Sequence, residues 1–130
     1  MQIEIISDLK YTDLRDGERV RLLDEFCVMV NMENLVCVAK GFISDLASVP
    51  WPFRRTFPRF GPWNAAALVH DWLYFCGEIA GEKITRRQAD RIFLGMMRAN
   101  PHVGFRAWPM YIAVRAGGWW AWREHRKGIL

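Results

Sequence analysis

Four prolines lie close together in the middle of the chain and limit what can form there. Pro50, Pro52, Pro58 and Pro62 all fall within residues 50–62. Proline fixes φ and removes a backbone donor, so this stretch suits neither a continuous helix nor a central strand. The sequence therefore predicts a proline-rich loop over residues 44–61, with a different type of structure on each side of it.

The first 43 residues have the composition and periodicity of strands. Apolar runs cover residues 3–6, 21–30 and 34–42, and the polar letters NMEN between the last two are typical of a hairpin turn. In the second run Phe26, Val28 and Val30 share one face, as expected for a strand with a buried side. We therefore expect a small N-terminal antiparallel β-sheet.

After the loop the apolar spacing becomes helical. Pro62 suits the first position of a helix that continues to residue 76 and ends at Gly77. Thr85 and Gln88 form a capping-box pattern, which opens a second helix that ends before Pro101. The short connection between the two helices predicts an antiparallel pair.

A third helical segment is expected between Gly104 and Lys127, interrupted near Pro109 and loosened at Gly117 and Gly118. The predicted fold is thus α+β: one domain over residues 1–130, mainly β in residues 1–43 and mainly α in residues 62–130, with three principal α-helices. A length of 130 residues and 52% hydrophobic content suit a single core.

The composition narrows the function classes. Cys27, Cys37 and Cys76 form no CxxC pair and are odd in number, so free thiols are expected. A net charge of +4 permits attraction to phosphates, but the basic residues are scattered and nucleic acid is not an expected partner. No apolar run reaches the roughly 18 residues of a membrane span, and the N-terminus lacks the features of a secretion signal. We expect synthesis in a cytoplasm.

A histidine and two aspartates stand out in the helical part. In the stretch LVHDWLYFC, residues 68–76, His70 shares a face with small alanines, which predicts a buried position. On the next helix Asp90 shares a face with Phe93 and Met97. At about 1.5 Å per residue, His70 and Asp90 both lie roughly 10 Å from the helix connection. The two side chains can therefore face each other.

Two interpretations of this pair stay open. An imidazole oriented by a carboxylate is a general-base arrangement, in which His70 takes a proton from water. Asp71, about one hundred degrees further around the helix, can then offer an oxygen ligand to a hard cation such as Ca²⁺. Alternatively, His70 and Asp90 form a structural polar pair that fixes the helix hairpin.

The residues His70, Asp71 and Tyr74, with Asp90-Arg91 on the partner helix, resemble the His-Asp-x-x-Tyr and Asp-Arg motifs of secreted calcium-dependent phospholipase A-two. The resemblance covers about a quarter of the chain. It implies that His70 activates water, Asp90 orients it, Asp71 binds calcium, and Tyr74 hydrogen-bonds the pair.

A longer resemblance covers nearly the whole chain. The motifs GFISDLASVPWPFRRTFP, HDWLY, Ala89-Asp90 and VRAGGWWAW are similar to a family of small proteins of tailed bacteriophages and prophages, described as a domain of unknown function. The resemblance implies a phage gene, often near tail genes. Asp45, in the first motif, either joins Asp71 as a metal ligand or caps the following turn.

We therefore expect a tailed-phage protein, a virion tail or baseplate component, with a hydrolase-like site that acts on an ester or amide of the host envelope. The alternative is a non-catalytic adaptor whose interface is formed by Trp119, Trp120 and Trp122. Expected partners are other phage structural proteins and host lipid or peptidoglycan. The protein would be made in the host cytoplasm and then become part of the virion.

Overall fold

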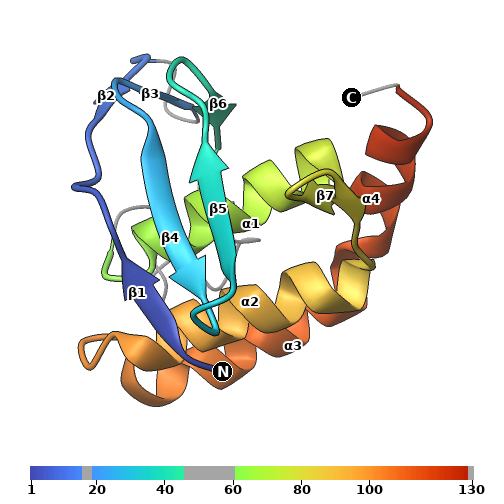
Figure 1. Ribbon diagram of the computed structural model, residues 1–130. Helices are drawn as coiled ribbons and strands as arrows, with labels where there is room; N and C mark the ends of the chain where they lie inside the picture. Colours follow the sequence, from blue (N-terminus) through green and yellow to red (C-terminus); the bar gives the residue numbers. More distant parts are fainter. Residues whose placement is uncertain (16–18, 46–60, 129–130) are drawn as a thin grey trace.

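Residues 1–15 and 19–45 contain two small antiparallel sheets, and the alternating apolar pattern predicts such β-structure. The computed structural model describes residues 1–15, 19–45 and 61–128 (Figure 1). Its strands before the helices are β1 (Ile3–Ile5), β2 (Tyr11–Asp13), β3 (Val20–Leu22), β4 (Phe26–Val30), β5 (Asn34–Val38) and β6 (Ile43–Ser44). One sheet has the order β1-β4-β5 and the other β2-β3-β6. Where one N-terminal sheet was expected, the structure therefore has two.

The apolar run over residues 21–30 does not form one strand. It contributes to β3 and then to β4, which belong to different sheets. The chain bends at residues 23–25, where Leu23 is 45% exposed and is followed by the charged Asp24 and Glu25. Within β4 the predicted faces are confirmed, since Phe26, Val28 and Val30 are buried.

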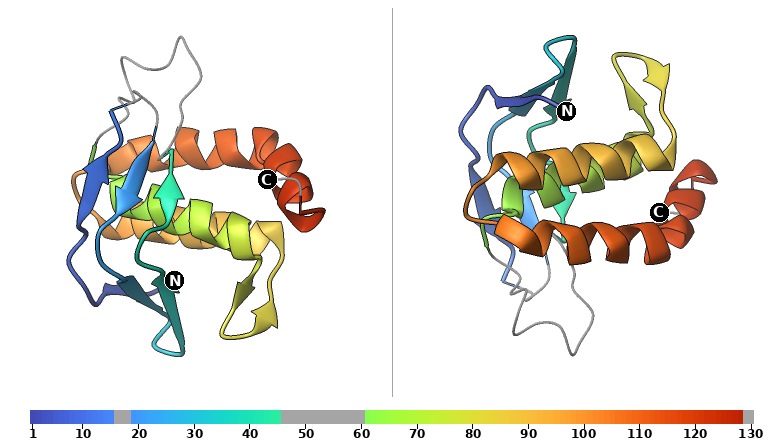
Figure 2. Two further views of the ribbon diagram at one scale, coloured as in Figure 1. Left: turned by 90° about the horizontal axis from the view of Figure 1, so that it is seen from above. Right: turned by 90° about the horizontal axis from the view of Figure 1, so that it is seen from below.

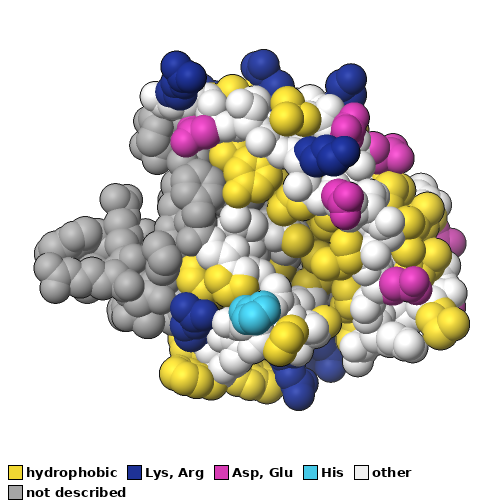
Figure 3. Space-filling view, turned by 90° about the vertical axis from the view of Figure 1, so that its left-hand side faces the viewer, with side chains coloured by type: hydrophobic (Ala, Val, Ile, Leu, Met, Phe, Trp, Pro, Cys, Tyr) yellow, Lys and Arg dark blue, Asp and Glu magenta, His cyan; other side chains and the backbone are white. Residues whose placement is uncertain are grey.

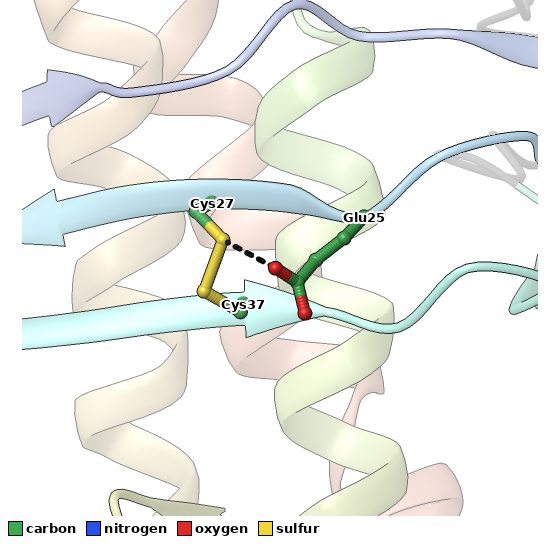
Figure 4. A group of neighbouring side chains, drawn as sticks. All are labelled: Glu25, Cys27 and Cys37. Atoms are coloured by element: carbon green, nitrogen blue, oxygen red, sulfur yellow. Dashed lines mark hydrogen bonds between the residues drawn. A yellow bond between two sulfur atoms is a disulfide. The ribbon is translucent and has the colours of Figure 1, made fainter.

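The β4–β5 hairpin is closed by a disulfide, so the expectation of free thiols is wrong for two of the three cysteines. Val30 pairs with Asn34, and this register places Cys27 opposite Cys37. Their Cα atoms are 4.1 Å apart, and the two sulfur atoms are bonded (Figure 4). Cys76 remains a free thiol. Direct cross-strand pairing brings together cysteines that are far from a CxxC spacing.

The remainder of the described chain is helical apart from one tiny hairpin. Its elements are α1 (Asn64–Cys76), β7 (Glu78–Ile79), β8 (Glu82–Lys83), α2 (Arg86–Ala99), the 3₁₀ turn η2 (Gly104–Arg106), α3 (Ala107–Gly117) and α4 (Trp119–Arg126). The described residues thus contain four α-helices, where three were expected. Together with the small antiparallel sheets they confirm an α+β fold.

The helix ends agree closely with the sequence signals. Gly77 ends α1 in a left-handed conformation, and its N–H donates to Leu73. Thr85 and Gln88 make both hydrogen bonds of the predicted capping box. The start of α1 differs: it begins two residues after Pro62, and the Asn64 side chain accepts a hydrogen bond from the Gly61 N–H in the preceding turn.

Pro109 does not interrupt the last helical segment, contrary to expectation. It lies in the first turn of α3, where backbone N–H groups have no intrahelical acceptor, so a missing donor costs little. The break lies instead at Gly118, between α3 and α4. The expected loosening at the glycine pair is therefore the actual boundary between two helices.

The core lies between the strands and α1, with α2 and α3 packed further along the helical layer. In Figure 2, α1, α2 and α3 lie side by side, and β1, β4 and β5 cross them. Trp63, at the start of α1, is fully buried, as are Val28 and Leu73. As predicted, α1 and α2 are antiparallel neighbours, and this arrangement positions the site described next.

Most of the predicted proline-rich loop, residues 46–60, lies outside the described residues. No described helix has both the length and the apolar composition that crossing a bilayer requires.

Candidate functional site

His70 and Asp90 meet in the interior, between α1 and α2. The Nε2 atom of His70 lies 2.7 Å from Oδ1 of Asp90, within hydrogen-bond distance. Asp90 is completely buried and His70 is 8% exposed. The predicted contact between the two helices is therefore present. Since a carboxylate only accepts, Nε2 carries the hydrogen and donates it to Oδ1; whenever the imidazole holds a single proton, Nδ1 then keeps a lone pair.

Tyr74 completes this cluster on the α1 side. One helical turn after His70, its hydroxyl donates to the same Oδ1 of Asp90 at 2.7 Å. The hydroxyl approaches Gly118 so closely that a Cβ at position 118 would overlap it. Tyr74 is therefore hydrogen-bonded to Asp90, the partner of His70.

Two arginines bind the other oxygen of Asp90, and sequence reasoning missed both. Arg115 of α3 donates to Oδ2 at 2.8 Å, and Arg86, one turn before Asp90 on α2, donates at 3.3 Å. Arg86 also donates to the carbonyls of Val114 and Arg115. An i,i+4 spacing was a signal for Arg86. Arg115 is 25 residues away, and no local signal points to it.

The electrostatics of the cluster favour an ionised Asp90. Burial alone would raise the pKa of Asp90, but hydrogen bonds from His70, Tyr74 and Arg115 outweigh burial, and its pKa is lowered. Burial and the hydrogen bond to Asp90 raise the pKa of Tyr74, so the phenol stays protonated. Asp90 is thus ionised at neutral pH and accepts hydrogen bonds from His70, Tyr74, Arg86 and Arg115.

Aromatic rings enclose the imidazole of His70. The ring of Tyr74 lies 4.3 Å from it, centroid to centroid, and that of Phe93 lies at 4.7 Å. These contacts hold the imidazole at a fixed angle, with its Nε2 edge toward Asp90. They also restrict access to His70, since only a small part of its surface is exposed.

The structure brings Asp71 and Asp45 together, at the edge where β6 meets α1. The Ser44 hydroxyl donates to Oδ2 of Asp71, and the carboxyls of Asp71 and Asp45 interact directly. Burial, with the charge and hydrogen bond of Asp45, raises the pKa of Asp71 well above its ordinary value. Two adjacent carboxyls need either a proton or a cation between them.

Their hard oxygen donors match the ligands that Ca²⁺ and Mg²⁺ prefer. Among the described residues, the group of three potential ligand residues that lies close enough for a metal is a different one, Glu25 with Cys27 and Cys37 (Figure 4). Both sulfurs there are bonded to each other, so no thiolate is available to a metal. Among the described residues, Asp71 and Asp45 offer carboxylate oxygens that are not engaged in such a bond.

One family pattern, that of a protein of unknown function (DUF1353), matches residues 20–114. The chain belongs to the DUF1353 family. The match confirms the expectation of a domain of unknown function. Asp45, His70, Asp71, Tyr74 and Asp90 all lie inside the matched region, whereas Arg115 and α4 lie beyond it.

No curated protein and no solved structure matches the chain. The DUF1353 family carries no described activity, so function has to be argued from the site itself.

Proposed function

We propose that this protein is a hydrolase in which His70 is the general base. The observation that carries the proposal is the hydrogen bond from His70 Nε2 to the buried Asp90, because it fixes the tautomer that leaves Nδ1 able to accept a proton. Tyr74, Arg86 and Arg115 support this role by holding Asp90 in place as an anion. The substrate class is an ester or an amide.

In the proposed reaction Nδ1 of His70 takes a proton from water as the water oxygen bonds to the carbonyl carbon. The imidazolium then returns that proton to the leaving oxygen or nitrogen while its bond to the carbonyl carbon breaks. The products are a carboxylic acid and an alcohol or amine. Asp90 stabilises the imidazolium through its hydrogen bond to Nε2.

Asp71 and Asp45 are the proposed ligands of a divalent cation, with calcium as the first candidate. When bound, such a cation would polarise the substrate carbonyl. The contact between the two carboxyls supports this assignment, because a cation would replace the proton that their proximity otherwise demands. Calcium should therefore raise the melting temperature of the wild type, and Asp45→Asn and Asp71→Asn should abolish that rise. Asp8→Asn, at an exposed carboxylate, is the control.

The deciding experiment measures fatty-acid release from phospholipid vesicles and fragment release from peptidoglycan, with calcium present. His70→Gln should lower the rate at least about a hundredfold, the scale of general-base catalysis, while the melting temperature changes little. His102→Gln, at an exposed histidine, should have wild-type activity. An inactive wild type on both substrates, or an active His70→Gln variant, would refute the hydrolase.

One observation favours a second candidate, the non-catalytic adaptor. Asp90 joins α1, α2 and α3 through charged and neutral hydrogen bonds, which is what a structural polar cluster does. In that case His70→Gln destabilises the fold, and no substrate is cleaved by the wild type.

For the biological setting we propose a tailed-phage protein of the virion tail or baseplate, made in the host cytoplasm. The motif resemblance around Asp45, His70 and Asp90 supports this setting. Peptide mass spectrometry of purified particles tests it, because a virion component must remain with the particle through density-gradient purification.

A further inference from the structure

Helix α3 is apolar on both sides, although one side faces solvent. Its inner side packs through Ala107 and Met110, which are buried. Its single charged residue, Arg115, donates to Asp90 instead of pointing into water. The α3 outer face consists of Phe105, just before the helix, Trp108 and Ile112, which are 83%, 48% and 62% exposed. A helix that is hydrophobic all round is normally covered on every side.

The exposed charges of the segment that carries this face, residues 86–128, are all basic. From Arg86 to Gly128 the chain has two acidic residues, Asp90 and Glu124, and both are buried. The exposed basic residues of the same region are Arg87, Arg91, Arg98, Arg123, Arg126 and Lys127. Figure 3 shows hydrophobic and basic side chains along the lower edge, where the connection from α2 to α3 lies, with no acidic side chain in view there. A partner must therefore combine apolar and anionic groups.

A cavity of about 510 Å³ lies on α2, and one of its lining residues, Arg98, also contacts Trp108 of the α3 outer face. Arg91 and Arg98 line it, together with Leu94 and Gly95. The guanidinium of Arg98 also stacks on Trp108, 5.3 Å from the ring centroid, and this contact links the cavity to the apolar face. Two guanidinium groups over an apolar floor suit the phosphate of an amphiphilic molecule.

The aromatic residues continue beyond α3. Trp119 and Trp120, at the start of α4, are each about half exposed, at 51% and 52%, and Arg123 stacks on Trp119 at 4.9 Å. Tryptophan beside arginine is the combination typical of the membrane–water interface.

We propose that the α3 outer face docks on a membrane surface that contains anionic phospholipids, with a headgroup phosphate in the cavity between Arg91 and Arg98. The apolar side chains enter the acyl boundary, and the arginines pair with phosphates around them. The helix lies on the surface and does not cross it. The proposal does not depend on hydrolysis, since none of these side chains belongs to the His70–Asp90 cluster.

The test is flotation of the full chain with vesicles. Vesicles of equal parts phosphatidylglycerol and phosphatidylcholine should carry the wild type to the top of the gradient. Added salt should weaken this binding. Phe105→Ser with Ile112→Ser should weaken the binding about tenfold or more. Met32→Ser with Leu35→Ser, at an exposed part of the β4–β5 hairpin, should leave it unchanged.

A second flotation experiment tests the role of charge. The double variant Arg91→Ala, Arg98→Ala should bind the phosphatidylglycerol vesicles more weakly than the wild type. Its control is Arg21→Ala with Lys40→Ala, which removes two exposed cations elsewhere. Flotation does not require catalysis, so a wild type that floats but cleaves neither substrate would refute the hydrolase and leave the membrane proposal standing. The proposal is overturned if the wild type stays at the bottom of the gradient, or if the Phe105→Ser, Ile112→Ser variant floats equally well. It is also overturned if the wild type is a dimer and this double variant is a monomer.

Discussion

Asp90 is the residue on which most of the polar interactions in the helical layer converge. His70, Tyr74, Arg86 and Arg115 all donate to it, and three helices supply these donors. Removal of its charge would leave two arginines without their carboxylate, which costs more than loss of a single hydrogen bond.

Asp90→Asn should therefore lower the free energy of unfolding by about 3 kcal/mol, measured by urea denaturation at neutral pH. Asp8→Asn, at an exposed carboxylate, should change it by less than about 0.5 kcal/mol. Equal stability of the two variants would show that the network contributes nothing to folding.

The lowered pKa of Asp90 also sets the sign of a pH dependence. A carboxyl whose pKa is lower in the folded state adds stability above its unfolded pKa of about 3.9, and loses it as pH falls through the folded value. The stability difference between wild type and Asp90→Asn should hence narrow below about pH 4. Urea denaturation of both proteins at a series of pH values measures this difference. If the difference did not change with pH, the lowered pKa of Asp90 would be contradicted.

Gly118 is the second residue with a specific requirement, because the Tyr74 hydroxyl occupies the space of a Cβ there. Gly118→Ala should destabilise the protein by about 1–3 kcal/mol, as expected for overpacking beside a backbone carbonyl and a fixed phenol. Gly117→Ala is a matched control, since nothing lies within 4 Å of its Cβ position. Thermal denaturation of both variants separates steric overlap from the general effect of glycine replacement.

The residues of the site were predictable in part. His70, Asp90 and Tyr74 follow from helical spacing and from the motif, because one helix face and one helix length fix where they meet. Arg115 could not be found in this way, since its contact with Asp90 depends on how α3 packs. The contact of Asp71 with Asp45 depends likewise on where β6 ends.

At the scale of elements, local sequence signals predicted the helix ends correctly, whereas the length of the β4–β5 turn could not be predicted. The capping box and Gly77 gave the helix ends correctly because both act within one turn. The β4–β5 turn spans residues 31–33, with Asn31 and Met32 in left-handed conformations. A turn one residue longer would place Cys27 opposite Val38. The disulfide thus depends on a single residue of turn length, which periodicity cannot resolve.

Reduction of this disulfide should lower the free energy of unfolding by about 2–3 kcal/mol, because the bond closes a loop between residues ten positions apart. Thermal melts with and without a phosphine reductant measure the effect. The Cys27→Ala, Cys37→Ala double variant should be insensitive to the reductant, whereas Cys76→Ser should respond like the wild type.

For the whole molecule, the shared core predicts one cooperative transition. Strands β4 and β5 pack on α1, so the β part and the α part cannot bury their apolar faces separately. Unfolding followed by far-ultraviolet circular dichroism and by tryptophan fluorescence should give coincident curves. Two separated transitions would show that residues 1–43 and 62–130 are independent domains.

Arg126 shows how far the helical layer depends on its last residues. Its guanidinium donates to the carbonyls of Tyr74 and Phe75 and fills the space beside Gly77, so α4 completes the exposed end of α1. A fragment trimmed to the family match would end at residue 114. This fragment would lose Arg115 and the hydrogen bonds from Arg126 to the end of α1. A fragment chosen for expression by the family boundary would therefore be an incomplete folding unit.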